Sequence, residues 1–372
     1  MPIARSRKLV LTAAGSALLV AAAAVAVAAE GDEEDRPPVR LVAPVGRPDP
    51  VPTGRLVKDR QPANCGVSEA TVRALVPRPG RNPRHCSWPV DRSTGPSLHV
   101  SLNVSDGIAK AMREYGGPTI RDPEWVAQMR PDGTVTVTGL GDEASFYQRP
   151  GRVHLFFRAA NVVARVDYEA PGENAEQVRD GGLRAASDMA RALGAPARPV
   201  QGAPSGTGKP VKQVPQVCDA LPGELAALLV PDGKPRRDDR RGPLWRRADM
   251  PVTTCVWEGA ERGLLVSLLS FPDGPPGPGA WQAERDYLEM HETARAENDG
   301  FTALAGLGEQ AYGAADRTTA KMMVVFRVRN VVGAVEYGEL RRHTLEPDAE
   351  ALKGAYTAGL KAAEKLAIAS GE

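Results

Sequence analysis

One stretch of this sequence occurs twice, and the repetition constrains the fold more than any other feature. Residues 156–168 return as residues 325–337 with a constant offset, which pairs Asn161 with Asn330. On both sides of each Asn, residues at every second position share one face and are mostly apolar, as in a β-strand. Strands joined by a tight turn run antiparallel. The stretch therefore predicts a strand, a turn at Asn and a second strand in each of two copies.

Shorter motifs recur around this hairpin in the same order. Each copy has a Cys, a short helical segment, a Cys-x-Trp motif, an apolar strand, a Gly-Leu-Gly turn with an acidic residue, the hairpin and a closing helix. The matching positions are Cys65 and Cys218, Cys86-Ser87-Trp88 and Cys255-Val256-Trp257, Leu98–Asn103 and Leu264–Leu269, and Gly139–Ala144 and Gly306–Ala311. We predict an α+β fold of two tandem copies of a small domain, each an antiparallel sheet packed by helices. The first copy spans 61–198, a linker 199–213, and the second copy 214–369.

The four cysteines allow three disulfide connectivities. One bridge within each copy is the simplest pairing, and it joins Cys65 to Cys86 and Cys218 to Cys255. Disulfides persist outside the reducing cytoplasm, so this pairing agrees with an exported chain.

The N-terminus also indicates export. Three basic residues precede an apolar run over 9–29, and an acidic cluster follows it, an order that places the rest of the chain outside the cytoplasm. Residues 1–29 are either a cleaved signal peptide or a transmembrane anchor. Ala26-Val27-Ala28 fits a cleavage site, whereas the run, at 21 residues, is also long enough to span a bilayer. Residues 30–60 form a Pro-rich acidic linker.

Several activities find no support in the sequence. The formal charge of +1 argues against nucleic-acid binding, which needs clustered excess cation. The two Gly-x-Gly-x-x-Ala motifs precede predicted strands, whereas a dinucleotide site needs a helix there. The five histidines show no metal-ligand spacing. We predict no catalytic residue, no metal ligand and no cofactor.

One candidate binding feature is rich in arginine. It is either a solvated loop or a docking site for an anionic partner, such as a cell-wall polymer or lipid headgroups, because Arg makes bidentate contacts with phosphate. The candidate residues are Arg236, Arg237, Arg240, Arg241, Arg246 and Arg247.

The order of motifs in both copies resembles an actinobacterial exported domain family of unknown function, usually found on lipoproteins. It is more distantly similar to the extracellular sensor domain of mycobacterial Ser/Thr kinases. The resemblance covers both copies, although no Cys follows the apolar run for lipid attachment. It implies an envelope-exposed, non-enzymatic module that binds or senses an unidentified ligand. The alternatives are an envelope hydrolase or transferase, with its polar cluster in one copy, and a structural spacer without a cleft.

Overall fold

The structure is a computed structural model. It describes residues 40–46, 57, 62–77, 79, 86–89, 95–116, 134–202, 210–240, 242, 244, 252–273, 278–297, 300–316, 321–340 and 349–370. Residues Val39–Glu372, which include both copies, form one unit by their contacts. The predicted signal peptide or anchor lies outside the described residues. No helix within the described part is long and apolar enough to cross a membrane.

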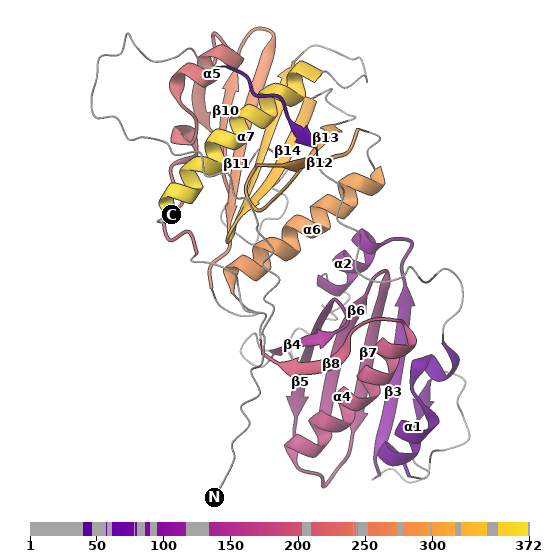
Figure 1. The fold of residues 1–372 in the computed structure, drawn as a ribbon. Helices are drawn as coiled ribbons and strands as arrows, with labels where there is room; N and C mark the ends of the chain where they lie inside the picture. The colour runs from indigo at the N-terminus through magenta and orange to yellow at the C-terminus, as the bar shows by residue number, and fades with distance from the viewer. Residues whose placement is uncertain are drawn as a thin grey trace, which may run out of the picture. The chain divides into compact units, whose positions relative to one another are not determined.

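The first copy is an antiparallel sheet with helices on both faces (Figure 1). Helix α4 lies against β6 and β7 on one face, and α2 contacts the same two strands. Its strands are β2 (Ser87–Trp88), β3 (Ser97–Val104), β4 (Thr134–Leu140), β5 (Glu143–Arg149), β6 (Arg152–Ala159), β7 (Val162–Glu169) and β8 (Ala197–Gln201). Its helices are η2 (Ala63–Gly66), α1 (Glu69–Leu75), α2 (Ile108–Gly116) and α4 (Ala175–Ala192).

The second copy repeats this arrangement with a longer helix, α6, on the second face (Figure 1). Its sheet also includes β1 (Val45–Gly46), which comes from far upstream in the chain. The other strands are β9 (Lys234–Arg237), β10 (Val252–Glu258), β11 (Arg262–Ser270), β12 (Thr302–Ala305), β13 (Gln310–Asp316), β14 (Lys321–Val328) and β15 (Val331–Glu339). Its helices are η5 (Val217–Asp219), α5 (Gly223–Leu229), α6 (Gly279–Glu297) and α7 (Ala349–Ala369).

The two sheets have corresponding strand orders. The order β2-β3-β7-β6-β5-β4 in the first sheet matches β10-β11-β15-β14-β13-β12 in the second, and the neighbouring strands pair antiparallel. The predicted α+β class, with an antiparallel sheet in each copy, is confirmed.

The turn asparagines hold the chain that enters each copy. Asn161 is buried; its side-chain oxygen accepts from the Val57 amide at 2.9 Å, and its Nδ2 donates to the carbonyls of Val57 and Ser105. Asn330 binds Val211 and Phe271 in the same pattern, and its oxygen accepts from the Val211 amide at 2.7 Å. The repeated Asn is therefore a clamp between the hairpin and a segment distant in sequence.

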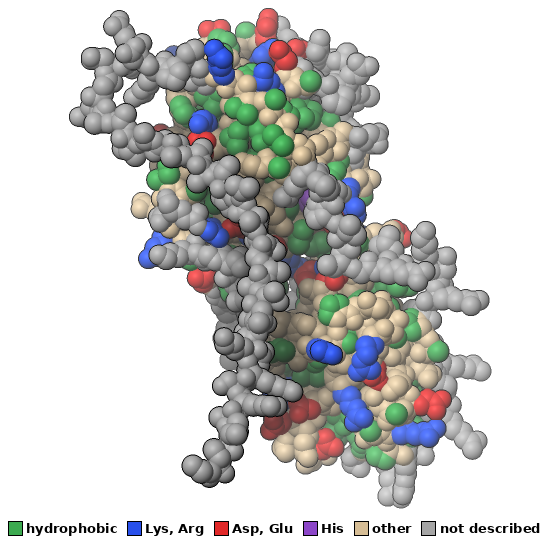
Figure 2. All heavy atoms as spheres, viewed as in Figure 1, with side chains coloured by type: hydrophobic (Ala, Val, Ile, Leu, Met, Phe, Trp, Pro, Cys, Tyr) green, Lys and Arg blue, Asp and Glu red, His purple; other side chains and the backbone are tan. Residues whose placement is uncertain are grey.

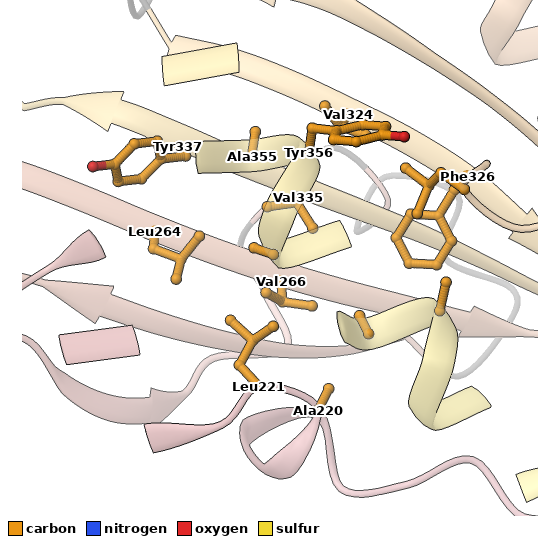
Figure 3. Packing of buried hydrophobic residues seen from close by; sticks show 14 of the residues in the cluster. Ala220, Leu221, Leu264, Val266, Val324, Phe326, Val335, Tyr337, Ala355 and Tyr356 are labelled. Carbon is orange, nitrogen blue, oxygen red and sulfur yellow. The ribbon is translucent and has the colours of Figure 1, made fainter. Parts of the chain in front are cut away.

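In the core of each copy, a tyrosine of the hairpin contacts a glycine of the closing helix and the C-terminal end of a short helix. The Tyr168 hydroxyl donates to the Leu75 carbonyl, and the Tyr337 hydroxyl donates to Leu229 at 3.1 Å. Gly354 of α7 faces the Tyr337 ring so closely that a Cβ there would lie 2.5 Å from a ring carbon. Figure 3 shows Tyr337 with Val335 and Leu264 in this core. The glycine is what allows the closing helix to approach the sheet.

The disulfides join the cysteines as predicted, with one bridge from Cys65 to Cys86 and one from Cys218 to Cys255. Trp88 and Trp257, which follow the second Cys of each pair, are buried in the cores of their copies. Two disulfides indicate an oxidising, extracytoplasmic compartment.

Candidate functional site

The Gly-Leu-Gly turn of each copy folds back onto the hairpin. Gly141 and Gly308 have positive φ angles of 62° and 60°, and a Cβ at either would lie 2.3 Å from the carbonyl oxygen of Arg158 or Arg327. Only glycine fits a left-handed position with so close a backbone neighbour. The strands β5 and β13 follow these turns directly. The turns are thus structural, because a dinucleotide loop would be followed by a helix.

A buried arginine lies under the turn of the first copy. Arg158 is 5% exposed; its Nε donates to Glu143 and its Nη1 to Asp142, both at 2.9 Å. The same Nη1 donates to the carbonyl of Ala160, whose amide donates to Asp142. Buried charges require this kind of pairing, since desolvation would otherwise exclude them from the interior.

The second copy carries a weaker version of this cluster. Arg327 donates to the neutral side chain of Gln310 at 2.8 Å and forms an ion pair with Glu309 at 2.7 Å. The Glu309 side chain is 26% exposed and also pairs with Arg329. The repeated arginines were visible in the sequence, but their burial was not, because the turn that covers them is folded by tertiary contacts.

Helix α6 of the second copy reaches the cluster in the first. Arg285 Nε donates to Glu143 at 2.5 Å, and its guanidinium lies 5.7 Å from the centre of the Tyr115 ring. Burial lowers the pKa of Arg285, but the interactions with Glu143, Tyr115 and Glu289 together outweigh it and the net pKa is raised. Arg113 of α2 also donates to Thr293 of α6 at 3.0 Å. Glu143 thus accepts from guanidinium groups of both copies.

A cavity of about 390 Å³ lies beside this cluster. Its volume falls in the range of small-molecule sites, roughly 300–1,000 Å³. Apolar side chains form much of its wall, and the ionic cluster supplies charged groups at one side. The lining includes Met112, Thr138, Leu140, Asp142, Glu143, Arg158, Trp281, Glu284, Arg285 and Leu288.

A second polar feature crosses the sheet of the first copy in one row. In register, Ser87 faces His99, His99 faces Asp167, Asp167 faces His154, and His154 faces Tyr147. Ser87 Oγ lies 2.6 Å from His99 Nδ1, and His154 Nδ1 lies 2.6 Å from Asp167 Oδ1. Burial raises the pKa of Asp167, but His154 and Arg165 outweigh it and lower the net pKa below its ordinary value.

The corresponding row of the second copy is mostly apolar. Register places Val256, Leu265, Glu336, Met323 and Ala314 side by side there. The rest of that face packs under α6, whose Tyr287 and Met290 are buried against Tyr312 and Val325. The row in the first copy contains a serine and two histidines, whereas the row in the second copy contains neither residue type. Sequence reasoning missed the row because its members come from different strands, and only their register brings them together.

The structure describes three of the six predicted anion-binding arginines. Arg236 and Arg237 lie in β9 and pair with Asp238 and Asp239 at 3.2 Å and 2.7 Å, and Arg240 follows them. Arg241, Arg246 and Arg247 lie outside the described residues. The acidic neighbours offset part of the charge, and Figure 2 shows acidic and basic side chains interspersed on the face in view. Anion binding here remains a prediction.

Within the described ranges, no three His, Cys, Asp or Glu side chains are arranged to hold a metal ion. No protein-family model and no curated protein matches the chain. Among solved structures, the chain matches DynU16, a protein in the dynemicin biosynthetic locus, with 14% sequence identity and a TM-score of 0.11. The match covers 73% of this chain and 97% of DynU16. A TM-score this low indicates neither a shared fold nor a shared function.

Proposed function

We propose that this protein is an exported, non-enzymatic binding protein of the cell envelope, and that its ligand occupies the cavity beside the Arg158 cluster. The cavity is the observation that carries the proposal. It combines apolar walls, which Leu140, Leu288 and Trp281 supply, with the fixed charges of Glu143 and Arg285. A site of this composition suits a ligand with an apolar body and a polar head group.

The ionic cluster supports binding more than it supports catalysis. Glu143 accepts from both Arg158 and Arg285, and Asp142 accepts from Arg158 and from the Ala160 amide. These bonds hold the carboxylates in place. A preorganised polar wall lowers the ordering cost of binding. The resemblance to envelope sensor domains leads to the same proposal.

A thermal-shift screen of the chain from Val39 to Glu372 tests this function with muropeptides, phospholipids and anionic wall polymers. A ligand at a hundred times its Kd stabilises the folded state by about 2.7 kcal/mol, which corresponds to a rise of several degrees in Tm. Thr138→Trp fills the cavity from β4 and should abolish the shift. Thr302→Trp, at an exposed position on β12, is the matched control and should retain it. A shift that survives Thr138→Trp would refute the site.

A hydrolase or transferase is the second candidate function, and the row Ser87, His99 and Asp167 favours it. The Ser87–His99 distance of 2.6 Å is that of a nucleophile beside its base. A fluorophosphonate tests it: Ser87 Oγ would bond to phosphorus, fluoride would leave, and His99 would take the hydroxyl proton. Labelling that Ser87→Ala and His99→Ala abolish would support an enzyme. The absence of labelling would leave the binding function in place.

A further inference from the structure

The outer edge strand of each sheet is covered by one more strand. In the first copy β8 pairs with β4, and in the second β1 pairs with β12, both antiparallel. The strand β8 follows the closing helix α4 of its own copy. The strand β1, in contrast, lies before the first copy in the chain. Its Val45 pairs with Ala305, which lies 260 positions downstream. We call residues 40–46 the strap.

The two covering strands occupy the same position in register. Val200 faces Thr138 and Val45 faces Ala305, and Thr138 and Ala305 each directly precede the Gly-Leu-Gly turn of their copy. Both valines follow a proline, Pro199 in β8 and Pro44 in the strap. The edge therefore takes an extended Pro-Val segment at one defined position, and two unrelated parts of the chain supply it.

Few contacts hold the strap. The Val42 amide donates to Thr357 Oγ1 of α7 at 2.8 Å, and the Val42 carbonyl lies 3.5 Å from the same hydroxyl. The Val45 backbone bonds to Tyr356, and Leu41 packs partly against the second core. Val42 and Val45 are 46% and 58% exposed, and the ladder to β12 is two residues long. The segment is recognised mainly through its backbone, which is how sheet edges bind peptides.

We propose that the β12 edge of the second copy is a strand-acceptor site for an extended Pro-Val segment of a partner polypeptide, and that the strap is its intramolecular competitor. Ten residues separate Gly46 from Val57, the next described residue, which is clamped by Asn161 in the first copy. A tether of ten residues that spans its two attachment points gives an effective concentration on the order of 1 mM. Since the strap is bound, its segment must have a Kd below about 1 mM as a free peptide.

The test uses a fluorescein-labelled peptide of residues 40–46 and the chain from Val39 to Glu372. The double substitution Leu41→Asp/Val42→Pro removes the apolar contact of the strap and its amide donor to Thr357. By fluorescence anisotropy this variant should bind the peptide with a Kd below about 1 mM. The wild type and Val42→Ala, which keeps the amide, should bind it at least about two times more weakly, because the tethered strap competes at an effective concentration on the order of 1 mM. No binding to the double variant would overturn the proposal.

Two further measurements keep the result decisive. Hydrogen exchange should show the backbone amides of β12 losing protection in the double variant and regaining it when the peptide is added. Unchanged protection of these amides would show that the strap does not cover the edge, and would also overturn the proposal. Adding Thr357→Val to the double variant removes the acceptor and should abolish peptide binding, while equal binding would place the peptide elsewhere. A concentration-dependent dimer of the wild type that Thr357→Val abolishes would identify the partner as a second copy of this chain.

Discussion

Replacing Arg158 by Met is the most direct way to test how the two copies differ. The substitution keeps an unbranched side chain of similar length and removes the guanidinium that donates to Asp142, Glu143 and the Ala160 carbonyl. Removing one partner of a buried ion pair costs roughly 3–5 kcal/mol, because a charge stays buried without compensation. Arg285 still donates to Glu143, so we expect the lower end, about 3 kcal/mol.

Arg327→Met is the matched substitution in the second copy and should cost less. Arg327 bonds to a neutral side chain, Gln310, and its one acidic partner, Glu309, is 26% exposed and keeps its ion pair with Arg329. The loss should be about 1.5 kcal/mol, the lower end of the range for hydrogen bonds to a charged group, because no carboxylate becomes isolated.

Hydrogen exchange monitored by mass spectrometry separates the copies within one chain. A loss of 3 kcal/mol lowers the protection of global-opening amides by roughly a hundredfold. Peptides from β6 and β7 should show this loss in Arg158→Met, whereas peptides from β14 and β15 should change roughly tenfold in Arg327→Met. Equal losses in the two variants, or no loss in the first copy, would refute the view that two buried carboxylates depend on Arg158.

Three further predictions follow from single contacts. Gly354→Ala should lower the free energy of unfolding by about 1 kcal/mol, because overpacking against Tyr337 costs roughly 1–3 kcal/mol and the higher helix propensity of Ala returns about 1 kcal/mol. Urea denaturation measures this loss, and the control Gly223→Ala, which has open space around its Cβ, should show none. A Gly354→Ala chain as stable as the wild type would contradict the contact. The lowered pKa of Asp167 means that its ionised form stabilises the fold above about pH 4, and that this contribution is lost as the pH falls through the folded pKa. The urea midpoints of wild type and Asp167→Asn should therefore differ most at about pH 7 and converge as the pH falls through the lowered folded pKa, and a gap that widens in acid would reverse the sign. Replacing the six candidate arginines by Gln should release the chain from Val39 to Glu372 from envelope fractions, and unchanged retention would exclude anion docking through Arg236, Arg237, Arg240, Arg241, Arg246 and Arg247.

Local patterns were enough to predict much of the fold. The recurrence of the Asn161 stretch at Asn330 predicted the duplicated hairpin, and the position of the cysteines within each copy predicted both bridges. The Ser68 hydroxyl accepts from the Thr71 amide at the start of α1, a local capping contact that serine favours at this position. These features depend on residues close in sequence or on internal repetition, so a single chain reveals them.

The candidate sites were not predictable in the same way. The row from Ser87 to Tyr147 draws on β2, β3, β7, β6 and β5, and its residues are separated by loops of unrelated length. The cavity joins Leu140 of one copy to Trp281 of the other. The burial of the Arg158 cluster was not predicted, because the alternation of residues along a strand assigns a side chain to a face of the sheet but does not show what covers that face.

The sequence by itself determined the duplicated α+β architecture and its two disulfides, because strand period, turn chemistry and repetition are encoded locally. Only the tertiary structure decided which segment covers each sheet edge. Pro44-Val45 and Pro199-Val200 are both extended Pro-Val segments, yet the first pairs with the second copy and the second with the first. An edge strand pairs through backbone N–H and C=O groups, which every extended segment carries. Which segment pairs with the edge therefore depends on which segments the chain can bring to it.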